Sequence, residues 1–184
     1  FALPIFLANL LQLTYSLADT RIVGTYLGDS ALAAVGATTT LSNLIVQFLM
    51  GMCNGFAIIS AQYFGAKDMG RLRKSLGNAL VLGILVAIVM TVAGLAFLQP
   101  ILRFLNVPAD LTDTAAQYVA VIIAGLIVTL LYDVLSATLR AIGDTVTPLI
   151  VLAISVVLNI GGDLFFIVVL KAGVRGAAIA TVLS

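Results

Sequence analysis

Two aspartates lie within long apolar segments, and each follows a proline at the same distance. Asp19 comes 15 residues after Pro4, and Asp163 comes 15 residues after Pro148. A carboxylate in the hydrocarbon core of a bilayer costs at least about 2.5 kcal/mol on insertion scales, so it normally faces a cavity, a partner or an ion pathway. Carboxylate oxygens bind protons and hard cations. The sequence therefore predicts that the functional chemistry of this protein takes place at these two carboxylates.

Further oxygen-bearing side chains accompany the two acids. Asn159 precedes Asp163 by four residues and Tyr15 precedes Asp19 by four, so each pair shares one helix face. Thr181, in the last apolar run, adds a hydroxyl group. Two close carboxylates cannot easily both ionise, which favours binding of a proton or a cation. Together these groups offer a set of oxygen ligands suited to H⁺ or Na⁺.

The same acids also have structural interpretations. Each aspartate could cap a broken helix or pair with an arginine such as Arg21. Asp133 is a third acid in an apolar segment, and it lies seven residues before Arg140 on the same helical face. A salt bridge with Arg140 and a role as an additional functional acid are both open for Asp133.

Three small or rigid residues are candidates for gating. Gly161 and Gly162 directly precede Asp163, where they either loosen the helix as a hinge or allow close packing against another helix. Pro4 either kinks the first helix or occupies its first turn.

The composition excludes several classes of protein. The chain is 62% hydrophobic and 9% charged, against about 25% charged residues in soluble domains. All eight acids are aspartates and there is no histidine, which excludes a histidine proton relay or a histidine-ligated zinc site. The lone Cys53 excludes a disulfide or a cysteine metal cluster within the chain. A net charge of +1 argues against a nucleic-acid partner.

No motif supports hydrolytic or group-transfer chemistry. The sequence contains no Walker loop, no zincin pattern and no nucleophile elbow. We therefore expect a protein that is not an enzyme and needs no cofactor other than a coupling ion.

The apolar segments predict an all-α, polytopic protein with the lipid bilayer as its surroundings. Each segment is long enough to cross about 30 Å of hydrocarbon, and backbone groups in lipid must be paired within helices. The final run ends early, so we expect a fragment cut at both ends. The prediction is one transmembrane unit, 1–184, with five complete helices and the start of a sixth, at 2–26, 32–61, 75–99, 115–139, 148–170 and 175–184.

Basic residues predict the orientation of these helices. The loop after the second segment contains Lys67, Arg71, Arg73 and Lys74, and the positive-inside rule places such a loop in the cytoplasm. The first and fifth segments then run outward, which puts both aspartates in the outer half of the membrane. If these two helices are neighbours, the two carboxylates line one pocket.

Four stretches, in order over nearly the whole chain, resemble the multidrug and toxic compound extrusion (MATE) transporters. They are DTRIVGTYLGDSALAAVG (19–36), QYFGAKDMGRLRK (62–74), LRAIGDTVTP (139–148) and GAAIAT (176–181). The resemblance implies a twelve-helix antiporter of two six-helix lobes, V-shaped about a central cavity. Such a protein moves small organic, often cationic compounds outward while Na⁺ or H⁺ runs inward. This chain would be the N-terminal lobe, with the missing C-terminal lobe as its partner, in a prokaryotic inner (plasma) membrane.

The resemblance also assigns roles to residues. The acid in the first helix and the Asn-x-x-x-Asp pattern in the fifth are similar to the DinF-like branch, in which such carboxylates hold the coupling ion. Carried over by motif, Tyr15 is adjacent to the ion site and Pro4 is the bend. At Asp133 we expect asparagine in many relatives, so the stoichiometry does not transfer simply. The site residues implied for H⁺ or Na⁺ are Asp19, Asn159, Asp163 and Thr181.

The sequence leaves two other functions open. A lipid-linked oligosaccharide flippase of the same superfamily would line its cavity with several arginines, and here only Arg21 lies well inside a predicted helix. A non-transporting membrane scaffold fragment would have its intramembrane acids salt-bridged, as in pairs of Asp19 with Arg21 or Asp133 with Arg140.

Overall fold

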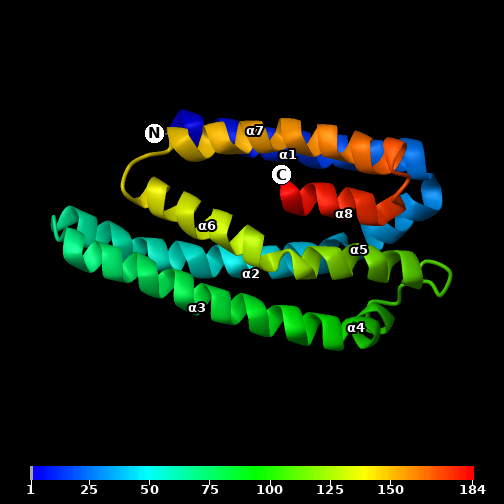
Figure 1. Cartoon of the computed structure of the whole chain (residues 1–184), viewed down its shortest axis with the longest axis horizontal. Coiled ribbons are helices and arrows are strands. Elements are labelled where there is room, and N and C mark those ends of the chain that lie inside the picture. Colours follow the sequence, from blue (N-terminus) through cyan, green and yellow to red (C-terminus); the bar gives the residue numbers. More distant parts are fainter. Residues whose placement is uncertain (1) are drawn as a thin grey trace.

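The computed structural model describes residues 2–184, with side chains from residue 6 onward, and within this range it consists of helices and short connections. The all-α prediction is confirmed. Figure 1 shows the helices lying roughly along one long axis. In chain order they are α1 (Ala2–Leu27), α2 (Asp29–Gly65), α3 (Met69–Ala96), α4 (Leu98–Phe104), α5 (Thr112–Ala124), α6 (Leu126–Ala141), α7 (Val146–Asp163), the π-helix η1 (Leu164–Val169) and α8 (Gly173–Leu183).

Two of the connections between helices turn at a glycine. A single residue, Gly28, separates α1 from α2, and its φ of 84° is a left-handed conformation that a side chain would disfavour. Gly143, between α6 and α7, has a φ of 99° for the same reason. The two long helices on either side of each glycine can therefore reverse direction and pack against each other.

Helices far apart in the sequence form the interior. α1 lies beside α7, and α2 packs against α3 and α6. α8 returns between α7 and α5, so the C-terminal end of the chain lies in the middle of the bundle (Figure 1). This arrangement brings side chains from α1, α5, α7 and α8 to one place.

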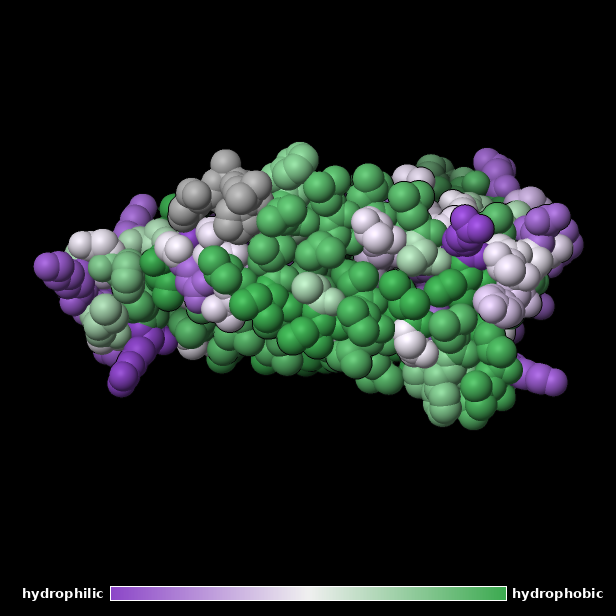
Figure 2. All heavy atoms as spheres, turned by 90° about the horizontal axis from the view of Figure 1, so that it is seen from above, coloured by the Kyte–Doolittle hydropathy of each residue, from purple (hydrophilic) through white to green (hydrophobic). Residues whose placement is uncertain are grey.

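The outside of the bundle is apolar along most of its length. Figure 2 shows hydrophobic side chains over the middle and hydrophilic ones at both ends. Large apolar side chains such as Phe48, Val89 and Val157 are more than half exposed. A belt of this kind fits the hydrocarbon core of a bilayer, with the polar ends at its two surfaces.

By length and hydropathy, three of the described helices qualify as membrane spans: α2, α3 and the continuous stretch Val146–Val169. The α5–α6 pair, bent by 47°, would make a fourth. This criterion counts fewer spans than the five predicted, since polar residues such as Asn9, Gln12 and Asp19 lower the mean hydropathy of α1.

The predicted segment 115–139 differs from the structure, which bends it at Gly125 between α5 and α6. A Cβ atom built on Gly125 would lie 2.4 Å from a methyl group of Val182 on α8. The bend therefore occurs where α8 approaches the backbone too closely for any side chain.

Candidate ion-binding site

Asp19 of α1 and Asp163 of α7 come together in the interior. Asp19 is 9% exposed and Asp163 is fully buried, and their carboxyl groups lie within interaction range of each other. One oxygen of Asp19 and both oxygens of Asp163 have no hydrogen-bond partner among the described residues. The pairing follows from the packing of α1 along α7, as expected if these helices were neighbours.

Within the described part of the chain, no cationic side chain forms a salt bridge with this pair. Among the described side chains, the only salt bridge joins Arg71 to Asp68 at the start of α3. Arg21, a predicted alternative partner of Asp19, lies on α1 with its side chain exposed. Two adjacent buried carboxyl groups without a counter-charge form a site that attracts a positive ion.

Asn159 lies one helical turn before Asp163 on the same face of α7. It is fully buried, and neither its amide nitrogen nor its amide oxygen has a hydrogen-bond partner in the part of the chain that the structure describes. An unsatisfied buried amide is unfavourable by roughly 1–3 kcal/mol. Its oxygen is therefore available to a ligand beside the two carboxyl groups.

α8, which packs against α1 and α7, contributes Thr181. The Thr181 hydroxyl donates to the carbonyl oxygen of Ala177 at 3.0 Å, which leaves its oxygen lone pairs free to accept or to ligate. The Tyr15 hydroxyl lies near Thr181 and Ser184 and within electrostatic range of both carboxyl groups. The structure thus brings Asp19 and Asp163 together with Tyr15, and Tyr15 lies near Thr181. That Asn159 and Thr181 act with them as ion ligands stays a prediction.

Tyr118 of α5 is a member of this cluster that the sequence analysis missed. It is 8% exposed and lies within electrostatic range of Asp19, Tyr15 and Asp163. A buried tyrosine normally needs a polar partner for its hydroxyl, and Tyr118 shares the buried face of α5 with Ala115 and Val119. This pattern could have indicated from the sequence that Tyr118 is buried, although it does not identify the polar partner of its hydroxyl group.

Asp133 lies elsewhere, on α6 against Cys53 of α2. It is 4% exposed, and one of its oxygens has no hydrogen-bond partner. Arg140 interacts electrostatically with Asp133, but the two side chains form no ion pair in the described part of the chain. The structure therefore separates this third acid from the Asp19–Asp163 pair.

The predicted gating residues have distinct settings. A Cβ on Gly162 would lie 3.1 Å from that of Ala180 on α8, so Gly162 serves close packing, whereas nothing lies within 4 Å of such an atom on Gly161. The helix loosens directly after Asp163, where η1 begins, and single π turns are frequent at functional sites. The backbone of Pro4 lies in the first turn of α1. The side chain of Pro4 lies outside the described residues, so its role as a bend stays a prediction.

The cluster contains the kinds of oxygen groups that a monovalent-ion site would need. Two carboxyl groups, an amide oxygen and a hydroxyl oxygen can hold one proton or coordinate one Na⁺. Within the described residues there is no group of three or more His, Cys, Asp or Glu side chains that could hold a metal ion.

Comparison with known proteins gives this geometry a family context. The family model described as MatE matches residues 4–165. The probable multidrug resistance protein YoeA of Bacillus subtilis is 33% identical over 190 residues, which cover 100% of this chain and 41% of that protein. The probable multidrug resistance protein NorM of Thermotoga maritima is 32% identical over 189 residues, covering 100% of this chain and 40% of that protein.

Solved structures agree with the sequence relatives. An outward-facing multidrug resistance MATE family transporter of the MOP superfamily superimposes with a TM-score of 0.91 at 28% identity, covering 98% of this chain and 40% of that chain. The present chain therefore spans about two fifths of the length of the relatives that it matches. Since the family model covers most of the chain, the chain belongs to the MATE family of multi-pass plasma-membrane transporters.

Proposed function

We propose that this chain is the N-terminal lobe of a secondary-active antiporter that exports small organic, often cationic compounds in exchange for H⁺ or Na⁺. The members of the family are transporters, not enzymes. The observation that carries the proposal is the buried Asp19–Asp163 carboxyl pair, which has no cationic partner among the described side chains. The second lobe would be supplied by the same polypeptide, because the relatives are about two and a half times as long.

The ion would bind where the pair most needs a positive charge. Two ionised carboxylates at one buried site repel each other, and a proton or Na⁺ between them removes that repulsion. The oxygens of Asn159 and Thr181 would complete the coordination of Na⁺, or accept hydrogen bonds around a protonated carboxyl group. Tyr15 would position the carboxyl of Asp19 from one turn away on α1.

Exchange follows if ion and substrate compete for the same negative charge. An ion that enters from outside and occupies the pair weakens the hold on a cationic substrate, which then leaves outward. The ion is released inward after the lobes have rocked. α1 and the π turn after Asp163 are the elements that would respond to ion binding. α1 carries Asp19, and the π turn directly follows Asp163.

Asp133 is proposed as an additional ion-binding acid that acts separately from the pair. It is buried against a different helix, so it would add a second ion per cycle rather than share the first. In Asp133→Asn, the ratio of ions to substrate measured from equilibrium gradients should fall while export persists. An unchanged ratio would leave Asp133 with a structural role only.

The alternative functions have less support. A flippase would line its cavity with arginines, yet most of the described arginines lie near helix ends and Arg21 is exposed on α1. A scaffold with salt-bridged acids would pair Asp19 with Arg21 or Asp133 with Arg140, and neither pair forms an ion pair in the described part of the chain.

Reconstituted transport tests the proposal. The full-length protein in proteoliposomes should move ethidium, a fluorescent organic cation, when an H⁺ or an Na⁺ gradient is imposed. Asp163→Asn should abolish this transport while the protein remains folded, and Asp110→Asn, in an exposed loop, should leave it intact. Unimpaired gradient-driven transport by Asp163→Asn would overturn the assignment.

A further inference from the structure

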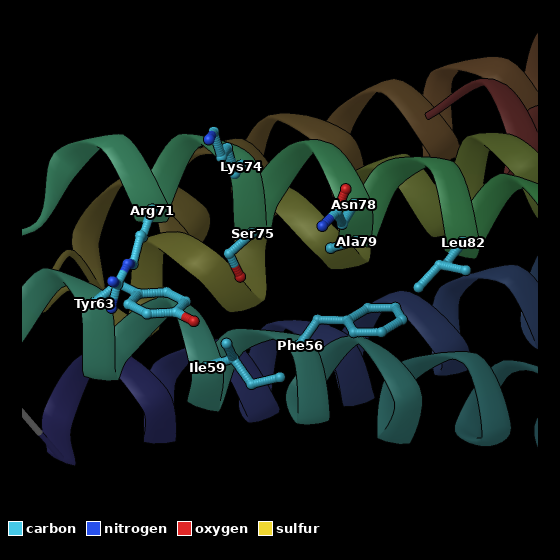
Figure 3. Close-up of a pocket in the computed structure, with 9 residues that line it drawn as sticks. All are labelled: Phe56, Ile59, Tyr63, Arg71, Lys74, Ser75, Asn78, Ala79 and Leu82. Atoms are coloured by element: carbon cyan, nitrogen blue, oxygen red, sulfur yellow. The ribbon is translucent and has the colours of Figure 1, made fainter.

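A groove runs between α2 and α3, apart from the ion site. It has a volume of about 350 Å³, and Figure 3 shows side chains from both helices along it. Its apolar part is formed by Phe56 and Ile59 of α2 and by Leu82 of α3. Ile59 and Leu82 are 45% and 51% exposed, so this part opens on the apolar outer surface rather than into the core.

The other end of the groove is basic and polar. Arg71 and Lys74 line it from the first turns of α3. Arg71 extends toward Tyr63 of α2, whereas the amino group of Lys74 points away from α2 (Figure 3). The Arg71 Nε atom lies 3.4 Å from an oxygen of Asp68, but the Arg71 side chain is 72% exposed, so most of the guanidinium group is free to bind an anion. Asn78 adds an amide further along the groove.

The groove has the dimensions of one membrane leaflet. From Arg71 to Leu82 it follows 11 residues of α3, which is about 16 Å at 1.5 Å per residue. Half of a hydrocarbon core about 30 Å thick is about 15 Å. A molecule with its head at Arg71 would therefore reach the middle of the bilayer near Leu82.

The sign of the charge separates this groove from the transport pathway. A cationic substrate would be repelled by two basic side chains, whereas a phosphate group would be attracted. The basic end adjoins the loop that the positive-inside rule places in the cytoplasm, and the cytoplasmic leaflet is the one rich in anionic lipids. Basic pockets between transmembrane helices on that side favour anionic headgroups.

We propose that the α2–α3 groove binds one anionic phospholipid, with its phosphate at Arg71, the exposed Lys74 side chain turning toward that phosphate, and an acyl chain along Phe56, Ile59 and Leu82. The lipid bridges two helices whose direct polar contact in this region is a single long hydrogen bond, 3.5 Å between the hydroxyls of Ser60 and Ser75. Bound lipid therefore holds the basic ends of α2 and α3 together.

Titration of the full-length transporter in neutral detergent with soluble, short-chain lipids tests the proposal. Dioctanoyl phosphatidylglycerol should bind saturably, and dioctanoyl phosphatidylcholine at least tenfold more weakly. Each basic residue near an anionic lipid contributes roughly a fivefold change in affinity, so Arg71→Gln/Lys74→Gln should weaken binding by more than tenfold. The matched control is Lys67→Gln/Arg73→Gln, which removes the same charge from exposed positions outside the groove and should change binding by less than about threefold.

Each other outcome overturns the proposal. Equal weakening by the two double variants would mean diffuse electrostatic attraction rather than a site. Binding of glycerol phosphate as tight as that of the lipid would mean a free-anion site without an acyl channel. Lipid affinity unchanged by Arg71→Gln/Lys74→Gln would mean that the groove does not hold the lipid, as expected if the second lobe covers it. All four substituted side chains are exposed, so folding of the variants is not at issue.

Discussion

Asp19 on α1 and Asp163 on α7 meet in the protein interior, although nearly the whole chain separates them in sequence. Their contact depends on the close packing of the first helix along the seventh (Figure 1). Because no basic side chain of the described residues pairs with them, a positive ion would stabilise the two carboxyl groups. The predictions below test the groups that surround this pair and the helices that hold it in place.

Removal of the Asn159 amide should weaken ion binding. Asn159→Ala deletes a buried oxygen beside the carboxyl pair, and loss of a group that supports an ion site typically lowers affinity tenfold to a hundredfold. The ion concentration for half-maximal ethidium transport should rise accordingly. Asn43→Ala, at an exposed position on α2, is the control and should leave it unchanged. The role of Asn159 as a ligand would be excluded by an equal effect of the two variants.

The hydroxyl group of Tyr118 should contribute to the ion dependence of transport more than to the stability of the fold. Tyr118→Phe keeps the packing of α5 but removes the only polar atom of the side chain, and a hydrogen bond contributes about 1 kcal/mol net, or roughly fivefold. We expect a severalfold rise in the ion concentration for half-maximal transport, with little change in thermal stability. Tyr26→Phe, at an exposed position, should have no effect on either quantity. Wild-type ion dependence in Tyr118→Phe would show that the residue only packs.

The contact between Gly125 and Val182 should resist any added side chain. Gly125→Ala places a Cβ atom 2.4 Å from the Val182 side chain, and overpacking of this kind typically destabilises a protein by about 1–3 kcal/mol. Gly36→Ala, with nothing within 4 Å of the new atom, is the control. Thermal unfolding in detergent should show a lower midpoint for Gly125→Ala only, and Val182→Ala should restore part of the loss. Absence of rescue by Val182→Ala would place the strain elsewhere.

Asp144 should stabilise the start of α7 in a pH-dependent way. Its carboxylate accepts hydrogen bonds from the Thr147 hydroxyl and from the backbone N–H groups of Val146 and Thr147, and these bonds lower the pKa of Asp144 below its usual value. Since the folded-state pKa is depressed, the stabilisation is present above the unfolded-state pKa of about 3.9 and is lost as the pH falls further through the folded-state pKa.

The matching experiment compares unfolding of the wild type and Asp144→Asn as a function of pH. The variant should be less stable at neutral pH, and the difference should shrink below about pH 4. A difference that stays constant down to pH 2 would mean that the charge of Asp144 is not what stabilises α7.

The sequence predicted the all-α fold class correctly because the bilayer constrains the backbone. Apolar runs long enough to cross hydrocarbon leave a helix as the only regular way to pair the backbone, and the glycines at 28 and 143 mark where the chain must turn. The acids were identifiable for the same reason, since a carboxylate such as Asp163 is unfavourable at membrane depth unless it has a function or a partner.

Contacts between helices were much harder to predict. The bend at Gly125 depends on the approach of Val182 from α8, and the sequence around Gly125 does not contain that information. Tyr118 was missed because its neighbours in the ion site come from α1 and α7 rather than from its own helix. The position of Asp133, apart from the pair and without an ion pair to Arg140, likewise depends on how α6 packs against α2.

The most direct test of the central claim measures ion release rather than transport. If Asp19 and Asp163 hold the coupling ion, addition of tetraphenylphosphonium, an organic cation, to the purified full-length transporter should release protons or Na⁺ into a weakly buffered solution. The double variant Asp19→Asn/Asp163→Asn should release none at this site, and Asp110→Asn should release the wild-type amount. Undiminished release from the double variant, with ligand binding intact, would contradict the account.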